Sequence, residues 1–105
     1  MVHHVALYKL HPAVSQETLE EMVRRTKSLL LKIPEALQVR SGKRIDPRCE
    51  FPFFVAIDFE NRAKQAMFRD DPVYFKFLEE VIRPHTSAEL LLDYEMEPGR
   101  NVKYS

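Results

Sequence analysis

Four side chains in this sequence can take part in acid–base chemistry. His4 and Tyr8 lie near the start of the chain, and Tyr74 and Asp93 lie in its second half. A carboxylate hydrogen-bonded to one imidazole nitrogen fixes the tautomer of a histidine and leaves the other nitrogen as a general base near neutral pH. Such a base could remove a proton next to a carbonyl group, and a tyrosine hydroxyl could hydrogen-bond the developing enolate.

The remaining reactive residue types favour structural explanations. His3 adjoins His4, but successive strand residues point to opposite faces, and no further His or Cys spacing is typical of zinc, so we expect no metal and no cofactor. Cys49 is the only cysteine, which excludes an intrachain disulfide, and its charged neighbours predict an exposed loop. Asp58 and Glu60 lie at a strand end, and we do not interpret them as a catalytic carboxylate pair.

The elements that position these residues follow from the apolar pattern. Residues 2–10 are rich in β-branched and aromatic side chains up to Pro12, which predicts a strand. Ser15 can cap a helix whose apolar residues recur at three-and-four spacing as far as Ile33, before Pro34. Residues 36–40 alternate and predict a second, weaker strand, followed by Gly42, which we interpret as a turn or bulge.

The second half repeats this order. Residues 53–60 are apolar on both faces and predict a buried strand. Asn61 can cap a short helix, and Asp71 followed by Pro72 begins a second segment with Tyr74 on its inward face. Residues 88–96 predict the last strand. The order β-α-β-β-α-β is that of an α+β, ferredoxin-like fold with an antiparallel four-stranded sheet and helices on one face.

Two consequences follow from that topology. The first and last strands are antiparallel neighbours in a ferredoxin-like sheet, so His4 can lie close to Asp93. The other sheet face would expose a larger apolar patch than monomers usually do, and a two-fold dimer is the commonest way to cover one. We therefore predict a homodimer in which sheet packs on sheet.

Composition limits the partners. The 105 residues suit one domain, which we place at residues 1–97 with a tail at 98–105. Sixteen Lys and Arg balance sixteen Asp and Glu without a long run of one sign, so we expect no nucleic-acid partner. No apolar stretch approaches the roughly 20 residues of a bilayer span, and no signal-peptide core is visible, so we expect a cytoplasmic protein without a membrane partner.

Five segments together resemble the stress-responsive dimeric α/β-barrel (Dabb) family. They are residues 4–10, 32–37 and 57–60, Asp71 with Pro72, and residues 92–95, in the order and spacing of the family. The resemblance covers residues 2–96 and implies the ferredoxin-like fold and the dimer. The family includes heat-stable stress proteins, antifungal plant proteins and a plant polyketide cyclase that closes an aromatic ring by aldol condensation.

The resemblance to that cyclase also implies site residues. The histidine of its first strand and the aspartate of its last strand match His4 and Asp93. Its catalytic histidine belongs to a His-Pro-Ala-His segment whose last position is occupied here by Tyr74. Its tyrosine partner falls on Phe68, and a third pocket histidine falls on Phe53.

We predict a homodimeric small-molecule-binding protein that takes an apolar, aromatic or polyketide-like ligand and could assist its cyclisation. The expected catalytic residues are His4, Asp93 and Tyr74, and the expected ligand-binding residues are Tyr8, Phe53, Phe68 and Phe77. One alternative is a non-enzymatic stress-responsive dimer in which His4 is structural. Another is a cofactor-free monooxygenase of phenolic substrates, because such enzymes also use dimeric ferredoxin-like barrels.

Overall fold

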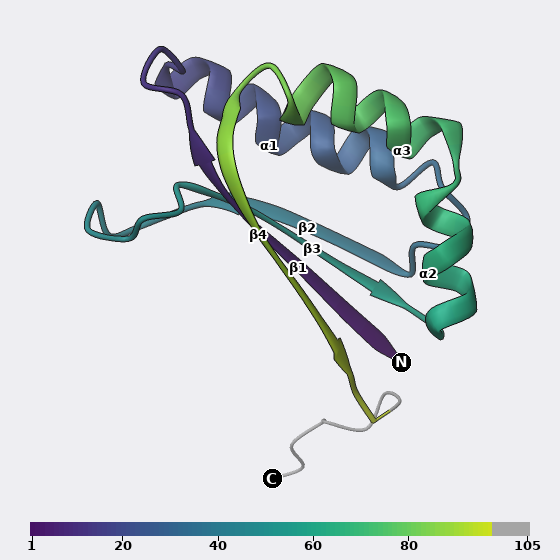
Figure 1. Ribbon diagram of the computed structural model, residues 1–105. Coiled ribbons are helices and arrows are strands. Elements are labelled where there is room, and N and C mark those ends of the chain that lie inside the picture. Colours follow the sequence, from purple (N-terminus) through teal and green to yellow (C-terminus); the bar gives the residue numbers. More distant parts are fainter. Residues whose placement is uncertain (98–105) are drawn as a thin grey trace, which may run out of the picture.

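Helices cover one face of an antiparallel sheet with the strand order β2-β3-β1-β4 (Figure 1). The computed structural model describes residues 1–97, and the predicted tail at 98–105 lies outside them. The elements are β1 (Val2–Leu10), α1 (Gln16–Leu30), β2 (Gln38–Lys43), β3 (Phe53–Phe59), α2 (Arg62–Arg69), α3 (Pro72–Phe77), η1 (Leu78–Ile82) and β4 (Thr86–Glu95). The predicted ferredoxin-like fold is confirmed.

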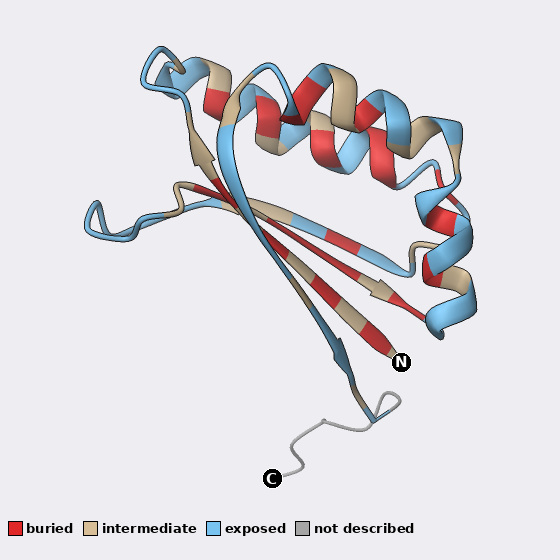
Figure 2. Cartoon of the chain, in the orientation of Figure 1, coloured by how far each residue is buried: buried red, intermediate tan, exposed pale blue. Residues whose placement is uncertain are grey.

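Alternation along β1 sets the two faces of the sheet. Val2, His4, Ala6 and Tyr8 are buried toward the helices, whereas the residues between them are only partly buried (Figure 2). Strand β3 repeats the pattern through its phenylalanine and β-branched residues. Because strand side chains alternate between faces, His4 and Tyr8 point into the same layer, between sheet and helices.

Helix α1 begins as its sequence predicts and ends earlier. The side chain of Ser15 accepts a hydrogen bond from the amide of Thr18 at 3.1 Å, which is an N-cap. The apolar face packs on the sheet, but the α-helix ends at Leu30 rather than Ile33. Proline clashes with the preceding helical turn, so Pro34 keeps the last predicted turn out of the α-helix. Ile33 is nevertheless fully buried.

The second helical region consists of separate segments, as predicted. Asn61 caps α2 by accepting from Lys64, and Asp71 caps α3 by accepting from Val73, with Pro72 at the first helical position. Helix α3 lies beside α1, whereas α2 lies at the end of the sheet (Figure 1). A π-helical turn, η1, extends α3 and was not predicted.

Gly42 corrects the sequence interpretation. It lies within β2, opposite Phe54 of β3, and not in a turn or bulge. A Cβ atom at this position would lie 2.7 Å from Cε1 of Phe54. The glycine therefore makes room for a cross-strand aromatic ring, a use that alternation along one strand does not reveal.

Strand β4 is less covered than its neighbours. Leu90 and Leu91 point to opposite faces of the sheet and are 41% and 49% exposed, so neither face of β4 is closed (Figure 2). Elsewhere the core joins α1, α3 and η1 to β1 and β3. Cys49 is exposed in the β2–β3 loop, as predicted. Among residues 1–97, no helix is long and apolar enough to cross a membrane.

Candidate functional site

The predicted meeting of the two ends of the chain occurs between β1 and β4. His4 and Asp93 are direct partners in the register of these strands, and Nδ1 of His4 lies 2.7 Å from Oδ1 of Asp93. An ionised carboxylate can only accept, so the ring donates through Nδ1 and its Nε2 is the acceptor in the neutral form. Nε2 has no hydrogen-bond partner within residues 1–97. Every fully buried side-chain nitrogen or oxygen in these residues does have a partner, so Nε2 is not fully buried. Nε2 therefore reaches solvent-accessible space, although His4 as a residue is only 8% exposed.

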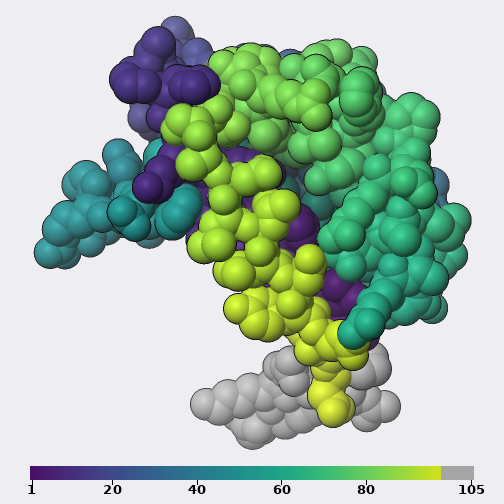
Figure 3. All heavy atoms as spheres, viewed as in Figure 1, coloured from purple at the N-terminus to yellow at the C-terminus, as the bar shows by residue number. Residues whose placement is uncertain are grey.

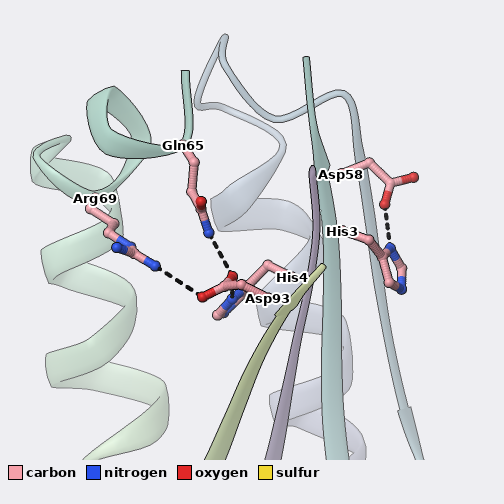
Figure 4. Close-up of polar contacts among 6 residues, drawn as sticks. All are labelled: His3, His4, Asp58, Gln65, Arg69 and Asp93. Atoms are coloured by element: carbon pink, nitrogen blue, oxygen red, sulfur yellow. Dashed lines mark hydrogen bonds and ion pairs between the residues drawn. The ribbon is translucent and has the colours of Figure 1, made fainter. Parts of the chain in front are cut away.

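Helix α2 supplies two further donors to the carboxylate of Asp93. Nε2 of Gln65 donates to Oδ1 at 2.7 Å, and a guanidinium nitrogen of Arg69 lies 3.4 Å from Oδ2 (Figure 4). Residues four apart share one face of a helix, so both side chains project from α2 toward β4. The carboxylate is thereby held by three side chains from β1 and α2.

These donors change the acidity of Asp93. Partial burial acts to raise the pKa of this carboxyl group. The hydrogen bonds from His4 and Gln65 and the positive charges of His4 and Arg69 act in the other direction and outweigh burial, so the pKa of Asp93 is lowered. The aspartate is therefore held ionised, as a residue that orients a histidine must be.

Two tyrosines lie on the same helix-facing side of the sheet as this pair, Tyr8 four residues after His4 in β1 and Tyr74 in α3. Tyr8 packs on Phe53, and Tyr74 packs between Phe68 and Phe77, with ring centroids 4.8 Å and 6.2 Å away. Neither hydroxyl has a hydrogen-bond partner within residues 1–97, and neither is fully enclosed. Each ring is thus fixed by the core, while its hydroxyl oxygen keeps some solvent-accessible surface, although Tyr8 as a residue is only 3% exposed.

Both phenols stay protonated well above neutral pH. Burial is the largest cause that raises the pKa of Tyr8, and the neighbouring Tyr74 and Glu89 raise it further. Burial also raises the pKa of Tyr74; the charge of Arg69 opposes this increase, and those of Glu89 and Asp93 add to it. The two hydroxyls can therefore donate as well as accept hydrogen bonds.

A crevice separates β4 from α2 and α3, with atoms of β1 at its floor (Figure 3). Asp93, whose side chain is 42% exposed, lines its β4 side. Near the start of β4 there is a cavity of about 370 Å³, lined by Leu78, Ile82, Glu89 and neighbouring residues. This arrangement offers a base at Nε2 of His4 and two hydroxyl donors, which are the functional groups that proton transfer next to a carbonyl group uses.

Comparison with known proteins identifies the family. The sequence matches the Stress responsive A/B Barrel Domain over residues 2–96. The chain belongs to this family. No functionally curated protein matches the sequence.

Solved structures share the fold of this A/B barrel domain at low sequence identity. A Dabb family protein of Mesorhizobium loti is 19% identical, with a TM-score of 0.79 over 91% of this chain and 96% of the other. A dimeric ferredoxin-like protein of unknown function from Thermobifida fusca is 19% identical, with a TM-score of 0.81 and 90% of each chain covered. The hydroxynitrile lyase of Passiflora edulis is 19% identical, with a TM-score of 0.79 over 93% and 94% of the two chains.

Three residues that we predicted as ligand contacts lie in the core of this A/B barrel domain. Phe53, Phe68 and Phe77 are 0%, 2% and 1% exposed and pack on other aromatic rings. In this structure they expose almost no surface and pack against Tyr8 or Tyr74, and their contact with a ligand stays a prediction. Aromatic residues on an inward face serve core and pocket alike, so their spacing could not distinguish the two uses.

Sequence reasoning missed several polar members of the site. Gln65 and Arg69 share one face of α2 beside the buried Phe68, and a buried glutamine on an apolar helix face was the available signal. Strand alternation was the available signal for Glu89, because this residue lies four positions before Asp93 on the same face of β4.

A second histidine–aspartate pair lies on the opposite face of the sheet. Nδ1 of His3 lies 2.5 Å from Oδ1 of Asp58, its direct partner in the β1–β3 register (Figure 4). The adjacent histidines of this A/B barrel domain therefore have separate aspartate partners on separate strands. As predicted, they do not share one face.

Proposed function

We propose that this protein is a homodimer that binds a small aromatic or polyketide-like ligand in the crevice beside β4 and transfers a proton at a carbon next to a carbonyl group. The observation that carries this proposal is the His4–Asp93 hydrogen bond together with the unpartnered Nε2 of His4. A buried imidazole with one nitrogen held by a carboxylate and the other accessible is arranged as a general base.

Each polar residue has a distinct part in the proposed reaction. Nε2 of His4 takes the proton, while Asp93 holds the imidazole tautomer and stabilises its protonated form. Gln65 and Arg69 position the carboxylate. The hydroxyl of Tyr74 donates to the carbonyl oxygen and stabilises the enolate that forms. An enolate could then add to a second carbonyl of the same ligand and close a ring.

The shared fold supports chemistry of this kind without assigning it. The Passiflora edulis protein of the same fold is named as a lyase that acts on hydroxynitriles. Our chain is similar to it at 19% identity, which is a likeness of fold. The support for acid–base chemistry here comes from the side chains of the crevice.

The homodimer is proposed from the helix-free face of the sheet. Leu90 and Tyr94 are 41% and 55% exposed, and Val5, Leu7 and Phe54 adjoin them on that face. A contiguous apolar face of this kind is typical of an interface. The related Thermobifida fusca structure is described as dimeric. A sheet-on-sheet dimer would cover this face and leave the crevice of each subunit, on the opposite face, open.

Ligand-induced thermal stabilisation tests the binding part of the proposal. A ligand that binds only the folded state raises its stability by about 2.7 kcal/mol at 100 times its dissociation constant, which is several degrees in Tm for a domain of this size. We expect a stabilising compound within a panel of phenols and aromatic 1,3-diketones. His4→Ala and Tyr74→Phe should reduce the shift, whereas His3→Ala, on the opposite face, should preserve it.

A non-enzymatic stress-responsive dimer is the second candidate. The observation that favours it is the burial of His4 with its Nδ1 proton satisfied inside the protein, because buried polar groups are paired whether or not they react. An unchanged Tm with every compound of the panel, together with a stable dimer, would select this function over the first.

A further inference from the structure

A second carboxylate, that of Glu89, lies on the same face of β4 as Asp93. The register pairs Glu89 with Tyr8 in the way that it pairs Asp93 with His4. A strand rises about 3.3 Å per residue, so the two acidic residues lie about 13 Å apart along β4. Leu91 lies between them on this face and is 49% exposed. The β4 side of the crevice therefore has an apolar middle and a carboxylate at each end.

The two carboxylates differ in their partners. Asp93 is held by donors from β1 and α2. Glu89 forms no ion pair with a basic side chain in the described part of the chain, and Arg83, which lines the same 370 Å³ cavity, is paired with Glu79. An ionised carboxylate has up to four acceptor positions and no donor. Glu89 is thus an acceptor open to a donor from a ligand.

Tyr8 is the neighbour of Glu89 at this end of the crevice. It faces Glu89 across the strands, and its hydroxyl lacks a hydrogen-bond partner within residues 1–97. Burial raises the pKa of Tyr8, so its phenol is protonated at neutral pH. This end of the crevice therefore offers one group that only accepts and one group that donates or accepts.

We propose that Glu89 determines ligand specificity by selecting a ligand that carries a hydroxyl group, such as a phenol, at the end away from His4. This inference rests on the proposed ligand-binding function of the crevice. A hydroxyl both donates, here to Glu89, and accepts, here from Tyr8. A carboxylate has nothing to donate and is repelled by Glu89, so it is selected against.

Two probes of one shape test this selection by isothermal titration calorimetry: 4-propylphenol and 4-propylbenzoate. Wild type is compared with Glu89→Gln and Glu89→Leu. The matched control is Glu95→Gln, which removes another carboxylate from the same face of β4, one that is ion-paired with Arg62 at 2.6 Å. Circular dichroism establishes that each variant is folded.

We expect wild type to prefer the phenol to the benzoate by about tenfold or more, as befits a hydrogen bond to a charged group. Glu89→Leu should weaken phenol binding and strengthen benzoate binding, and so remove the preference. Glu89→Gln should give an intermediate ratio of the two affinities. Glu95→Gln should change neither affinity. Equal phenol affinity in wild type and both Glu89 variants overturns this inference and leaves the proposed function standing. Failure of both probes to bind wild type overturns this inference and the proposed function.

Discussion

Nδ1 of His4 lies 2.7 Å from Oδ1 of Asp93, and the two residues face each other directly in the β1–β4 register although 89 positions separate them in the chain. A slip of β4 by one residue would place Leu92 or Tyr94 opposite His4 and move Asp93 to the other face. The pair therefore exists only in this register. The same strand alternation that builds the core also places His4 beside Asp93.

The lowered pKa of Asp93 gives the stability a definite dependence on pH. Because the folded state favours the ionised carboxylate, this contribution is fully present above the ordinary aspartate pKa of about 4 and is lost as pH falls through the lower folded value. The side chain is 42% exposed, so solvent screens the interaction, and we expect Asp93→Asn to lower the free energy of unfolding by about 1 kcal/mol at pH 6. Urea denaturation should show this difference shrinking below pH 4. A difference that stays constant down to pH 2.5 would contradict this account of Asp93.

Gln65 should act through Asp93. Gln65→Met keeps the size of this buried side chain and removes its donor, so we expect a loss of about 1 kcal/mol in the free energy of unfolding. Gln65→Glu should cost more at neutral pH, because it places a second carboxylate beside Asp93, and the extra cost should disappear in acid. Denaturation at pH 7 and pH 4 measures both variants. Equal stability of the two variants at pH 7 would show that Gln65 does not face the charge.

Gly42 should not tolerate replacement by a larger residue. A methyl group at this position would lie 2.7 Å from Cε1 of Phe54, which is closer than van der Waals contact. We expect Gly42→Ala to lower the free energy of unfolding by about 1–3 kcal/mol through overpacking. In a protein that already carries Phe54→Leu, the Gly42→Ala substitution should lower the free energy of unfolding by less, because the smaller side chain relieves the clash. Strictly additive losses would show that the glycine serves another purpose.

Adjacent leucines of β4 give a matched test of the homodimer. Leu90 points to the helix-free face of the sheet and Leu91 to the crevice, and the two are similarly exposed, at 41% and 49%. We expect light scattering to show that Leu90→Glu is monomeric, because a charge in an apolar interface is strongly unfavourable, and that Leu91→Glu remains dimeric. Dissociation by Leu91→Glu alone, or a monomeric wild type at micromolar concentration, would contradict the sheet-on-sheet arrangement.

The parts of the site that follow from strand periodicity could be predicted from the sequence. Alternation places His4 and Tyr8 on one face, and the ferredoxin-like topology makes their strand the neighbour of the one that carries Asp93. Cap residues likewise marked the starts of α1, α2 and α3, because an N-cap is a local interaction within three residues.

Features that depend on packing between distant elements could not be predicted. The contact of Gln65 with Asp93 depends on how α2 lies at the end of the sheet, which no local pattern specifies. The role of Gly42, which we interpret from the sequence as a turn or bulge, could not be predicted, because its ring partner, Phe54, belongs to another strand. The pattern of residues 53–60 predicted the burial of Phe53 but not whether it lines a pocket, since a pocket and a core have the same aromatic pattern.

Deuterium incorporation into a ligand measures whether His4 acts as a general base in the crevice. The probe is 3,5-dihydroxyphenylacetone in D2O, followed by proton NMR at the carbon between ring and carbonyl. We expect wild type to accelerate exchange, His4→Ala to lose about 10²–10⁴-fold of that acceleration, and His3→Ala, which removes the paired histidine of the opposite face, to retain it. Exchange that is no faster with wild type than in buffer, or equally fast with His4→Ala, would show that His4 is not a general base.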